Sequence, residues 1–200
     1  MPAMSSFLRL ILSFGLLLPL CAPLPAVAQE QPKQTAALKS EPERLNALFT
    51  ELKRQGDETK ARAISDQIRR EWTDSGSASV NLLMQWAEKA ITDKKESVAL
   101  DLYDQVIVLD PAYVEGWNRR ATLHYQMGNY RKSMSDINRV LTLEPRHFGA
   151  LAGMAAIFSA SGQDELALKA WERFLDVYPA DRKAQEQLGA LEEKLAGNRI

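Results

Sequence analysis

The residue types that most often carry out chemistry are few in this sequence of 200 residues, and they stand apart. The two histidines, His124 and His147, form no His-x-x-x-His pair, and Cys21 has no second cysteine as a fellow metal ligand. The many carboxylates are scattered, with no pair marked by an apolar cleft. Ser161 lacks the strand–turn–helix setting of a catalytic serine. We therefore expect no enzyme activity, no metal site and no cofactor.

The residues that do recur indicate architecture. Pro111, Pro145 and Pro179 stand at equal intervals of 34 residues. A fixed period of this length is typical of an array of helix–turn–helix units, in which each unit buries its apolar face only against its neighbours. The period divides this part of the chain into three units, 80–113, 114–147 and 148–179.

The three units match position by position. Large residues recur at the fourth position, and small residues recur at the eighth and twentieth, where two helices would cross closely. In unit order these are Leu83, Trp117 and Leu151; Ala87, Ala121 and Ala155; and Ala99, Ser133 and Ala167. Gly128 and Gly162 occupy the fifteenth position, which suits a turn with positive φ. The first unit has Lys94 there, so we expect its turn to be made differently.

This pattern resembles that of the tetratricopeptide repeat (TPR) family. The resemblance covers about 80–179, and the second unit matches best, with Trp117, Ala121, His124, Gly128, Tyr130, Ile137, Val140 and Pro145. It implies an all-α, right-handed superhelical stack of helix–turn–helix repeats. Two residues depart from the family pattern: Arg120 stands where many repeats have Leu, and Ser133 replaces the usual Ala, which slightly enlarges the helix crossing.

The histidines and tryptophans then have structural explanations. His124 falls at a position that the family usually fills with an aromatic packing residue. His147 lies between Pro145 and the next helix, where we expect a solvated turn. The tryptophans are spaced as packing residues; they are Trp72, Trp86, Trp117 and Trp171.

Helical segments are predicted on both sides of the repeats. Residues 44–79 are predicted to form a degenerate N-terminal hairpin of two amphipathic helices followed by a loop. The apolar residues of its two helices are Leu45, Leu48, Phe49 and Leu52, and Ala61, Ile64, Ile68 and Trp72. Because the hairpin has repeat-like size, we expect it to cover the open end of the stack. Residues 180–200 are predicted to form a polar capping helix that solvates the other end.

The N-terminus is a separate segment. Arg9 precedes the apolar run Leu10–Leu20, and Ala26-Val27-Ala28 fits a signal-peptidase site. We therefore expect residues 1–28 to be a signal peptide that is cleaved near Ala28, which would leave a mature chain without stable membrane insertion in the periplasm or cell envelope. An uncleaved anchor and lipidation at Cys21 are the alternatives. Residues 29–43 are predicted to be a disordered leader.

The family resemblance also implies a binding surface. In TPR proteins the first helix of each unit lines a concave groove that holds partner segments. The matching positions in the first two units include Asn81, Met84, Glu88, Glu115, Asn118, Thr122, Tyr125 and Gln126. The third unit offers mainly small residues, namely Gly149, Ala152, Ala156, Ser159 and Ala160. That face is either filled by the C-terminal helix or left open as a pocket for a partner.

The charges narrow the choice of partner. A net charge of −1 argues against a nucleic-acid partner, which would require a basic face. Asn81, Glu115 and Gly149 stand where some family members carry the basic clamp that grips a C-terminal carboxylate, so binding of Hsp70 or Hsp90 tails is not expected. We expect an exported adaptor or scaffold that binds a peptide or helical segment, in a bacterial cell-envelope assembly. The alternative is a periplasmic holdase or assembly chaperone, which would expose a broad apolar patch instead of a polar groove.

Overall fold

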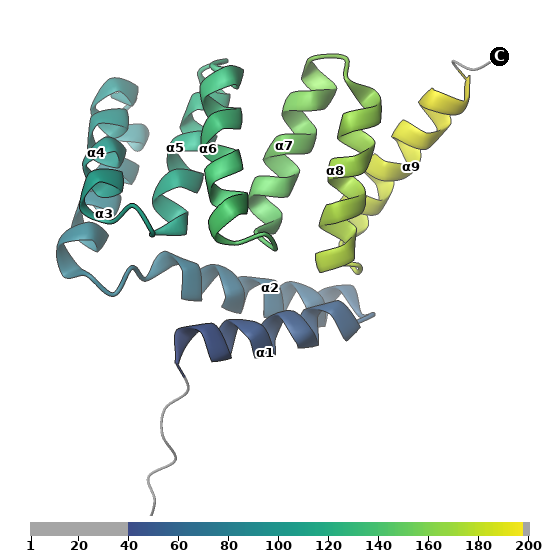
Figure 1. Cartoon of the computed structure of the whole chain (residues 1–200), viewed down its shortest axis with the longest axis horizontal. Coiled ribbons are helices and arrows are strands. Elements are labelled where there is room, and N and C mark those ends of the chain that lie inside the picture. The colour runs from purple at the N-terminus through teal and green to yellow at the C-terminus, as the bar shows by residue number, and fades with distance from the viewer. Residues whose placement is uncertain (1–39, 198–200) are drawn as a thin grey trace, which may run out of the picture. The chain divides into compact units, whose positions relative to one another are not determined.

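The computed structural model describes residues 40–197, which form nine α-helices and no strand (Figure 1). The predicted signal peptide and most of the predicted leader lie outside the described residues. The helices are α1 (Glu41–Arg54), α2 (Glu58–Thr73), α3 (Ala78–Thr92), α4 (Glu96–Leu109), α5 (Val114–Gln126), α6 (Tyr130–Leu143), α7 (Phe148–Ala160), α8 (Asp164–Val177) and α9 (Arg182–Gly197). None of the nine is long and apolar enough to cross a membrane.

The three repeats are the helix pairs α3–α4, α5–α6 and α7–α8, which stand side by side in Figure 1. Two of them start where the 34-residue period places them, at Val114 and Phe148. The first repeat starts two residues before Val80, because the Ser77 side chain caps α3 by accepting from the Val80 N–H at 3.5 Å. The sequence therefore predicted the repeats closely, and the all-α repeat stack is confirmed.

The three intra-repeat turns share one conformation. Gly128 and Gly162 have φ of 74° and 69°, and Lys94 has φ of 59°. In each turn the residue that follows donates its N–H to a carbonyl five positions earlier, at 2.8 Å; these bonds are Lys95 to Ala90, Asn129 to His124 and Gln163 to Phe158. The expectation of a different first turn was wrong: Lys94 accepts the left-handed conformation because the helix-ending hydrogen bonds over-determine it.

Small residues lie where the two helices of a repeat cross. Ala87 and Ala99 are fully buried in the first repeat. In the second repeat Ser133 is also fully buried, and its hydroxyl donates to the Ala121 carbonyl at 2.8 Å. The hydroxyl group that makes this crossing larger is therefore satisfied, as a buried polar group must be.

The N-terminal hairpin α1–α2 does not cover the open end of the stack. It lies across the ends of the later helices (Figure 1), where Phe49 and Trp72 share one core cluster with Phe148, Phe174 and Tyr178. The prediction of an end-covering hairpin was wrong because the aromatic surface at the start of α7 and the end of α8 offers a larger apolar partner.

Polar contacts reinforce this placement. Lys53 pairs with Asp176 at 2.8 Å, and Arg146 donates to the Asn46 side chain at 2.8 Å. At the other end of the hairpin, the Tyr113 hydroxyl donates to the Thr73 carbonyl at 2.8 Å. The hairpin is thus bonded to the second and third repeats and, through Tyr113, to the end of the first.

The C-terminal helix α9 packs on α8. Asp181 caps it by accepting from the Ala184 N–H at 2.9 Å. Ala184 and Leu191 are buried, and Leu188 and Leu195 are half-buried, so its apolar side faces the stack while the rest is polar.

Candidate partner-binding groove

The predicted groove residues line two neighbouring hollows. The first hollow, of about 330 Å³, lies between α2, α3 and α5, and its lining includes Asn81, Met84, Glu88 and Glu115. The second hollow, of about 210 Å³, lies between α5, α6 and α7, and its lining includes Asn118, Thr122 and Tyr125. Gln126 is exposed and lines neither hollow. Seven of the eight predicted residues therefore line a hollow, four of them the first and three the second.

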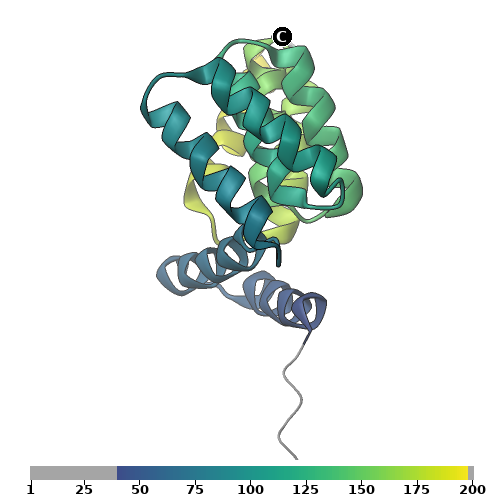
Figure 2. The ribbon, with the colours of Figure 1, turned by 90° about the vertical axis from the view of Figure 1, so that its left-hand side faces the viewer.

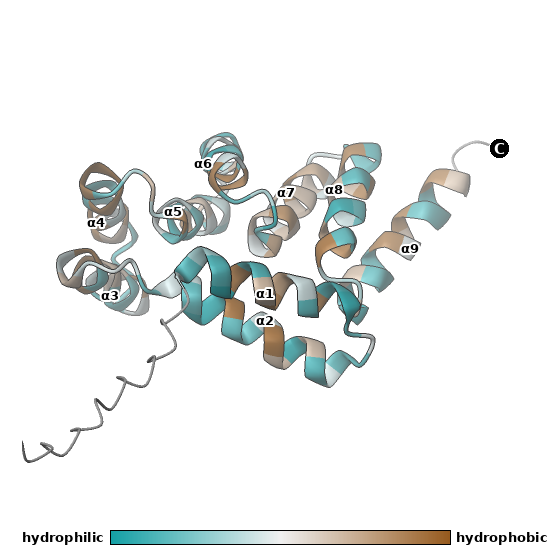
Figure 3. Cartoon of the chain, turned by 60° about the horizontal axis from the view of Figure 1, so that its bottom comes forward, coloured by the Kyte–Doolittle hydropathy of each residue, from teal (hydrophilic) through white to brown (hydrophobic). Residues whose placement is uncertain are grey.

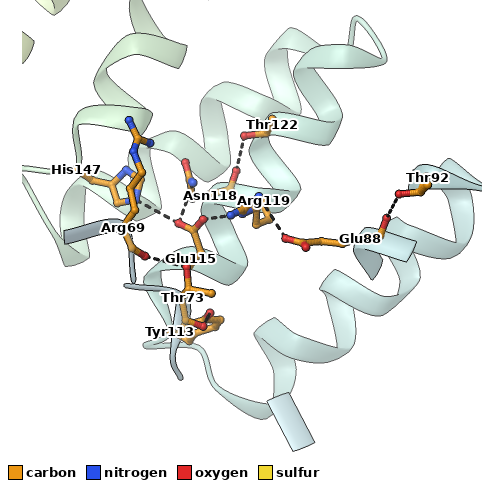
Figure 4. Close-up of polar contacts among 10 residues, drawn as sticks. All are labelled: Arg69, Thr73, Glu88, Thr92, Tyr113, Glu115, Asn118, Arg119, Thr122 and His147. Atoms are coloured by element: carbon orange, nitrogen blue, oxygen red, sulfur yellow. Dashed lines mark hydrogen bonds and ion pairs between the residues drawn. The ribbon is translucent and has the colours of Figure 1, made fainter. Parts of the chain in front are cut away.

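Glu115 is the centre of a polar network (Figure 4). Its carboxylate is buried and accepts from Arg119 Nε at 2.6 Å and from Asn118 Nδ2 at 2.9 Å. His147 Nε2 lies 3.4 Å from the same carboxylate. Because its acceptor sites face these internal donors, Glu115 orients neighbouring groove residues and is not a free contact for a partner.

His147 is buried, contrary to the prediction of a solvated turn. Its Nδ1 accepts from the Ala150 N–H at 3.0 Å, so the ring proton sits on Nε2 and points to Glu115. The Trp72 ring stacks on the imidazole with centroids 4.0 Å apart. The sequence could not place His147 because the residue that covers it comes from the N-terminal hairpin.

The pKa of Glu115 reflects these contacts. Burial raises the pKa of its carboxyl. The hydrogen bond from His147 and the adjacent Arg119 guanidinium lower that pKa by more than burial raises it, so the net pKa lies below its usual value. The carboxylate is therefore ionised at neutral pH, and it holds the charge of Arg119 in the groove.

Arg119 links the first two repeats across the first hollow. Its Nη1 lies 3.3 Å from the Glu88 carboxylate on α3. Both side chains are partly exposed, so this ion pair adds little stability, but it defines where charge stands in the hollow. Sequence reasoning missed Arg119, although its position four residues after Glu115 is the spacing of a helical ion pair.

Asn81 is committed to the loop before α3. Its side-chain oxygen accepts from the Ser75 hydroxyl at 2.7 Å, and its Nδ2 donates to Asp74 at 2.9 Å. Hydrogen bonds from Asn81 and from the Gly76 N–H lower the pKa of Asp74. The loop thereby places Asp74 at the rim of the first hollow, together with Arg70 from α2. Neither residue could be predicted from the sequence, because their role depends on where the hairpin packs.

Tyr125 is the large groove residue that remains available. It is partly exposed, and its ring contacts that of Tyr130 with centroids 5.4 Å apart. Thr122 donates its hydroxyl to the Asn118 carbonyl within α5 at 2.9 Å, so it presents mainly its methyl group. Across the second hollow, a Cβ on Gly149 would approach the His147 ring to 3.2 Å. A side chain at this position would therefore press on the buried histidine.

The small-residue face of α7 is not filled by the C-terminal helix. Because α9 packs on α8, Gly149, Ala152 and Ala156 stay half-buried while Ser159 and Ala160 are exposed. Ala152 contacts the aromatic core cluster of the hairpin instead. The face is therefore partly covered from its N-terminal side and open beyond it.

The other candidate residues have structural roles. His124 is buried, as predicted for a packing residue, and burial lowers the pKa of its ring. Arg120 forms two hydrogen bonds to Asp136, at 2.8 and 2.7 Å, and a third to Asp104 at 2.6 Å. The departure of Arg120 from the family pattern is thus explained by a polar bridge between α4, α5 and α6. Trp86, expected to be a packing residue, is half exposed.

A period of 34 residues, antiparallel helix pairs and a row of polar side chains on the first helices define a helical-repeat protein. A TPR repeat-containing protein of Rhizobium etli is 58% identical over 202 residues, which cover 97% of this chain and 99% of that relative. The chain therefore belongs to the TPR repeat-containing family. No family model matches the sequence.

A more distant relative is similar in sequence, and two solved structures share the fold. The small glutamine-rich tetratricopeptide repeat-containing protein 2 of Mycosarcoma maydis is 22% identical over 63% of this chain and 36% of its own length. The first TPR domain of Spaghetti (RPAP3), solved with the HSP90 peptide SRMEEVD, has a TM-score of 0.56 at 24% identity and covers 62% of this chain and 97% of that domain. The crystal structure of MamA has a TM-score of 0.55 at 15% identity, over 70% of this chain and 84% of that chain.

Proposed function

We propose that this protein is an exported adaptor whose groove holds a peptide or helical segment of a partner protein. The observation that carries the proposal is the Glu115 network, which fixes Arg119 in the first hollow and Asn118 in the second, where the partly exposed Tyr125 also lies. A preformed polar surface of this kind spares the protein the entropy cost of ordering its own side chains on binding. The peptide-bound RPAP3 domain supports the same mode of action for a similar fold.

The ligand differs in chemistry from an acidic tail. Glu115 and Glu88 bring negative charge to the first hollow, and Arg119 is already paired with both. A terminal carboxylate would have to displace these pairs, so we propose an internal peptide segment with polar and apolar side chains. We expect micromolar affinity, which corresponds to about −8 kcal/mol.

The cell envelope is the proposed location. The support is the arrangement of Arg9, the apolar run Leu10–Leu20 and the Ala26-Val27-Ala28 site. The relative that aligns over 97% of this chain comes from a bacterium, which supports the bacterial part of the proposal.

Photo-crosslinking in cells tests the groove. A photoreactive residue at Tyr125 or Asn118 is expected to capture a partner protein, whereas one at Leu166, an exposed apolar residue of α8, is not. The double variant Tyr125→Ala, Asn118→Ala is expected to abolish capture with nearly unchanged helix content, at a temperature where it is still folded, while Leu166→Ala captures normally. Tyr125 should contribute most because it offers apolar area and a hydroxyl at low entropic cost. Normal capture by the double variant would place the site elsewhere, with the open part of the α7 face next to be tested.

A holdase or assembly chaperone is the second candidate. The observation that favours it is the exposure of Leu82, Trp86 and Leu109 at one end of the stack, since unfolded clients bind apolar surface. The test is suppression of aggregation of a chemically unfolded protein at stoichiometric amounts. Suppression that is lost in Trp86→Asp but retained in the groove double variant would support the holdase over the adaptor.

A further inference from the structure

In the second and third repeats, two positions on the first helix contact the second helix of the preceding repeat. In the second repeat these are Gly116 and Arg120: a Cβ on Gly116 would come within 2.7 Å of Val106 on α4, and Arg120 pairs with Asp104 of the same helix. The matching residues of the third repeat, Ala150 and Met154, are buried in a cluster with residues of α6. Each repeat after the first is therefore covered at these positions.

In the first repeat the same two positions have no preceding helix to cover them. They hold Leu82 and Trp86, which lie four residues apart on one side of α3 and are 43% and 52% exposed. The hairpin that could have covered them packs on the far repeats instead. Figure 2 views the chain from this end, with α3 and α4 toward the viewer.

Helix α4 continues the exposed surface. Val98, Leu102 and Leu109 are spaced four and seven residues apart, so they share one side of the helix. Val98 and Leu109 are exposed and Leu102 is half-buried. Long stretches of α3 and α4 are hydrophobic in Figure 3. We call the surface formed by these three residues with Leu82 and Trp86 the end face.

We propose that the end face is a dimer interface, at which two copies of this chain pack about a two-fold axis. About such an axis, the end face of one copy packs against the end face of the other. Two-fold dimers are the commonest soluble oligomers. A second copy also offers what the end face lacks: helix α4, which already packs on the corresponding residues of α5 within the chain. Trp86 at the centre is the residue type most enriched at the energetic centres of interfaces.

The charges at the two ends of the end face are complementary. Lys94 and Lys95 stand at the α3–α4 turn between Asp93, which is paired with Lys89, and the exposed Glu96, and neither lysine forms an ion pair with another residue of 40–197. Asp110 follows the opposite end of α4. An antiparallel pairing about the two-fold axis would place the lysines of one copy near Asp110 of the other. This complementarity favours a second copy over an unrelated apolar partner.

Sedimentation velocity on the purified full-length chain tests the dimer, with its mass recorded to define the N-terminus. From roughly 1 to 100 μM protein, a reversible dimer is expected. Trp86→Asp should weaken it more than about tenfold without loss of helix content. Val108→Asp is the matched control, because Val108 is 81% exposed on α4 but points about 100° away from Leu109 around the helix. Its dimer is expected to persist.

A charge exchange tests the antiparallel orientation. Lys95→Glu should weaken the dimer, and adding Asp110→Lys to the same chain should restore it. A wild-type chain that stays monomeric over the whole range, or a dimer that survives Trp86→Asp, overturns the proposal. Capture of a foreign protein through a crosslinker at Trp86 by a monomeric chain overturns it as well, in favour of a partner on the end face.

Discussion

Glu115 determines the electrostatics of the groove although it is buried. Its carboxylate holds Arg119 and Asn118 in place and accepts a hydrogen bond from His147 Nε2. Removing a buried acceptor leaves its donors without partners, which costs more than the bond itself contributes. Groove geometry and stability therefore depend on the same residue.

This dependence predicts a response to acid. Since the folded pKa of Glu115 lies below its usual value of 4.5, its contribution is fully present above about pH 4.5 and is lost as the pH falls through the folded pKa. Glu144, whose pKa is lowered against burial by Arg146, acts in the same direction. The melting temperature should therefore fall on acidification below pH 4.5.

Glu115→Gln is expected to cost about 1–3 kcal/mol at neutral pH, because an amide replaces the charged acceptor. Between about pH 5 and pH 3, its melting temperature should also fall less steeply than that of the wild type, because one titrating group is gone. The measurement is thermal unfolding by circular dichroism at a series of pH values. Parallel curves for the two proteins would show that Glu115 does not titrate differently on unfolding.

Trp117 tests how far the repeats depend on one another. The ring is half-buried, its Nε1 donates to the Pro111 carbonyl at 3.1 Å, and the Arg120 guanidinium lies 5.0 Å from its centroid. We expect Trp117→Ala to cost about 2 kcal/mol, less than a fully buried tryptophan would. Hydrogen exchange should also rise in the neighbouring repeats, because each repeat packs only on its neighbours. A change confined to the second repeat would argue against coupling.

Repeat position predicted on which side of its helix a residue lies, whereas contacts with a distant part of the chain could not be predicted. Met84 and Tyr125 line the hollows that their positions predict. His147 was assigned to solvent because its immediate neighbours are turn residues, whereas Trp72 covers it. Spacing along one helix carries no information about which other element packs on it.

At the scale of helices, the N-terminal hairpin both lines the first hollow and packs on the buried histidine of the groove. Trp72 lies against both His147 and Phe148, with ring centroids 4.0 and 5.0 Å away. The hairpin therefore helps to hold the histidine that in turn bonds Glu115. The hydrophobic stripes of α1 and α2 predicted that these helices bury one face, but not which surface they bury it against.

Trp72→Ala should consequently disturb both stability and binding. We expect a loss of about 3–5 kcal/mol, since the ring is buried among aromatic neighbours. Partner capture through Tyr125 should weaken too, measured at a temperature where the variant is still folded. Trp86→Ala is the matched control: its ring is half exposed, so in dilute protein its stability should change by less than about 1 kcal/mol. Equal losses for both variants would contradict the assigned burial.

At the scale of the whole molecule, export can be tested directly. Expression in a bacterial host is expected to yield a processed chain that begins at Gln29, because cleavage follows Ala26-Val27-Ala28. Intact mass and N-terminal sequencing of the extracytoplasmic fraction measure this. A product that keeps Cys21 with added lipid mass would establish a lipoprotein, and an unprocessed chain in the membrane fraction would establish an anchor.

The placement of the hairpin also sets the order in which the protein completes its fold. Repeat arrays normally form through contacts between residues that are near in sequence, and they therefore fold fast. Here Lys53 and Asp176 are 123 residues apart, and Asn46 and Arg146 are 100 apart. Helices α1 and α2 are synthesised before the third repeat and cannot dock until that repeat has been made, so their packing is completed late in folding. Such a delay would suit the export proposed above, in which the chain crosses a membrane before it folds.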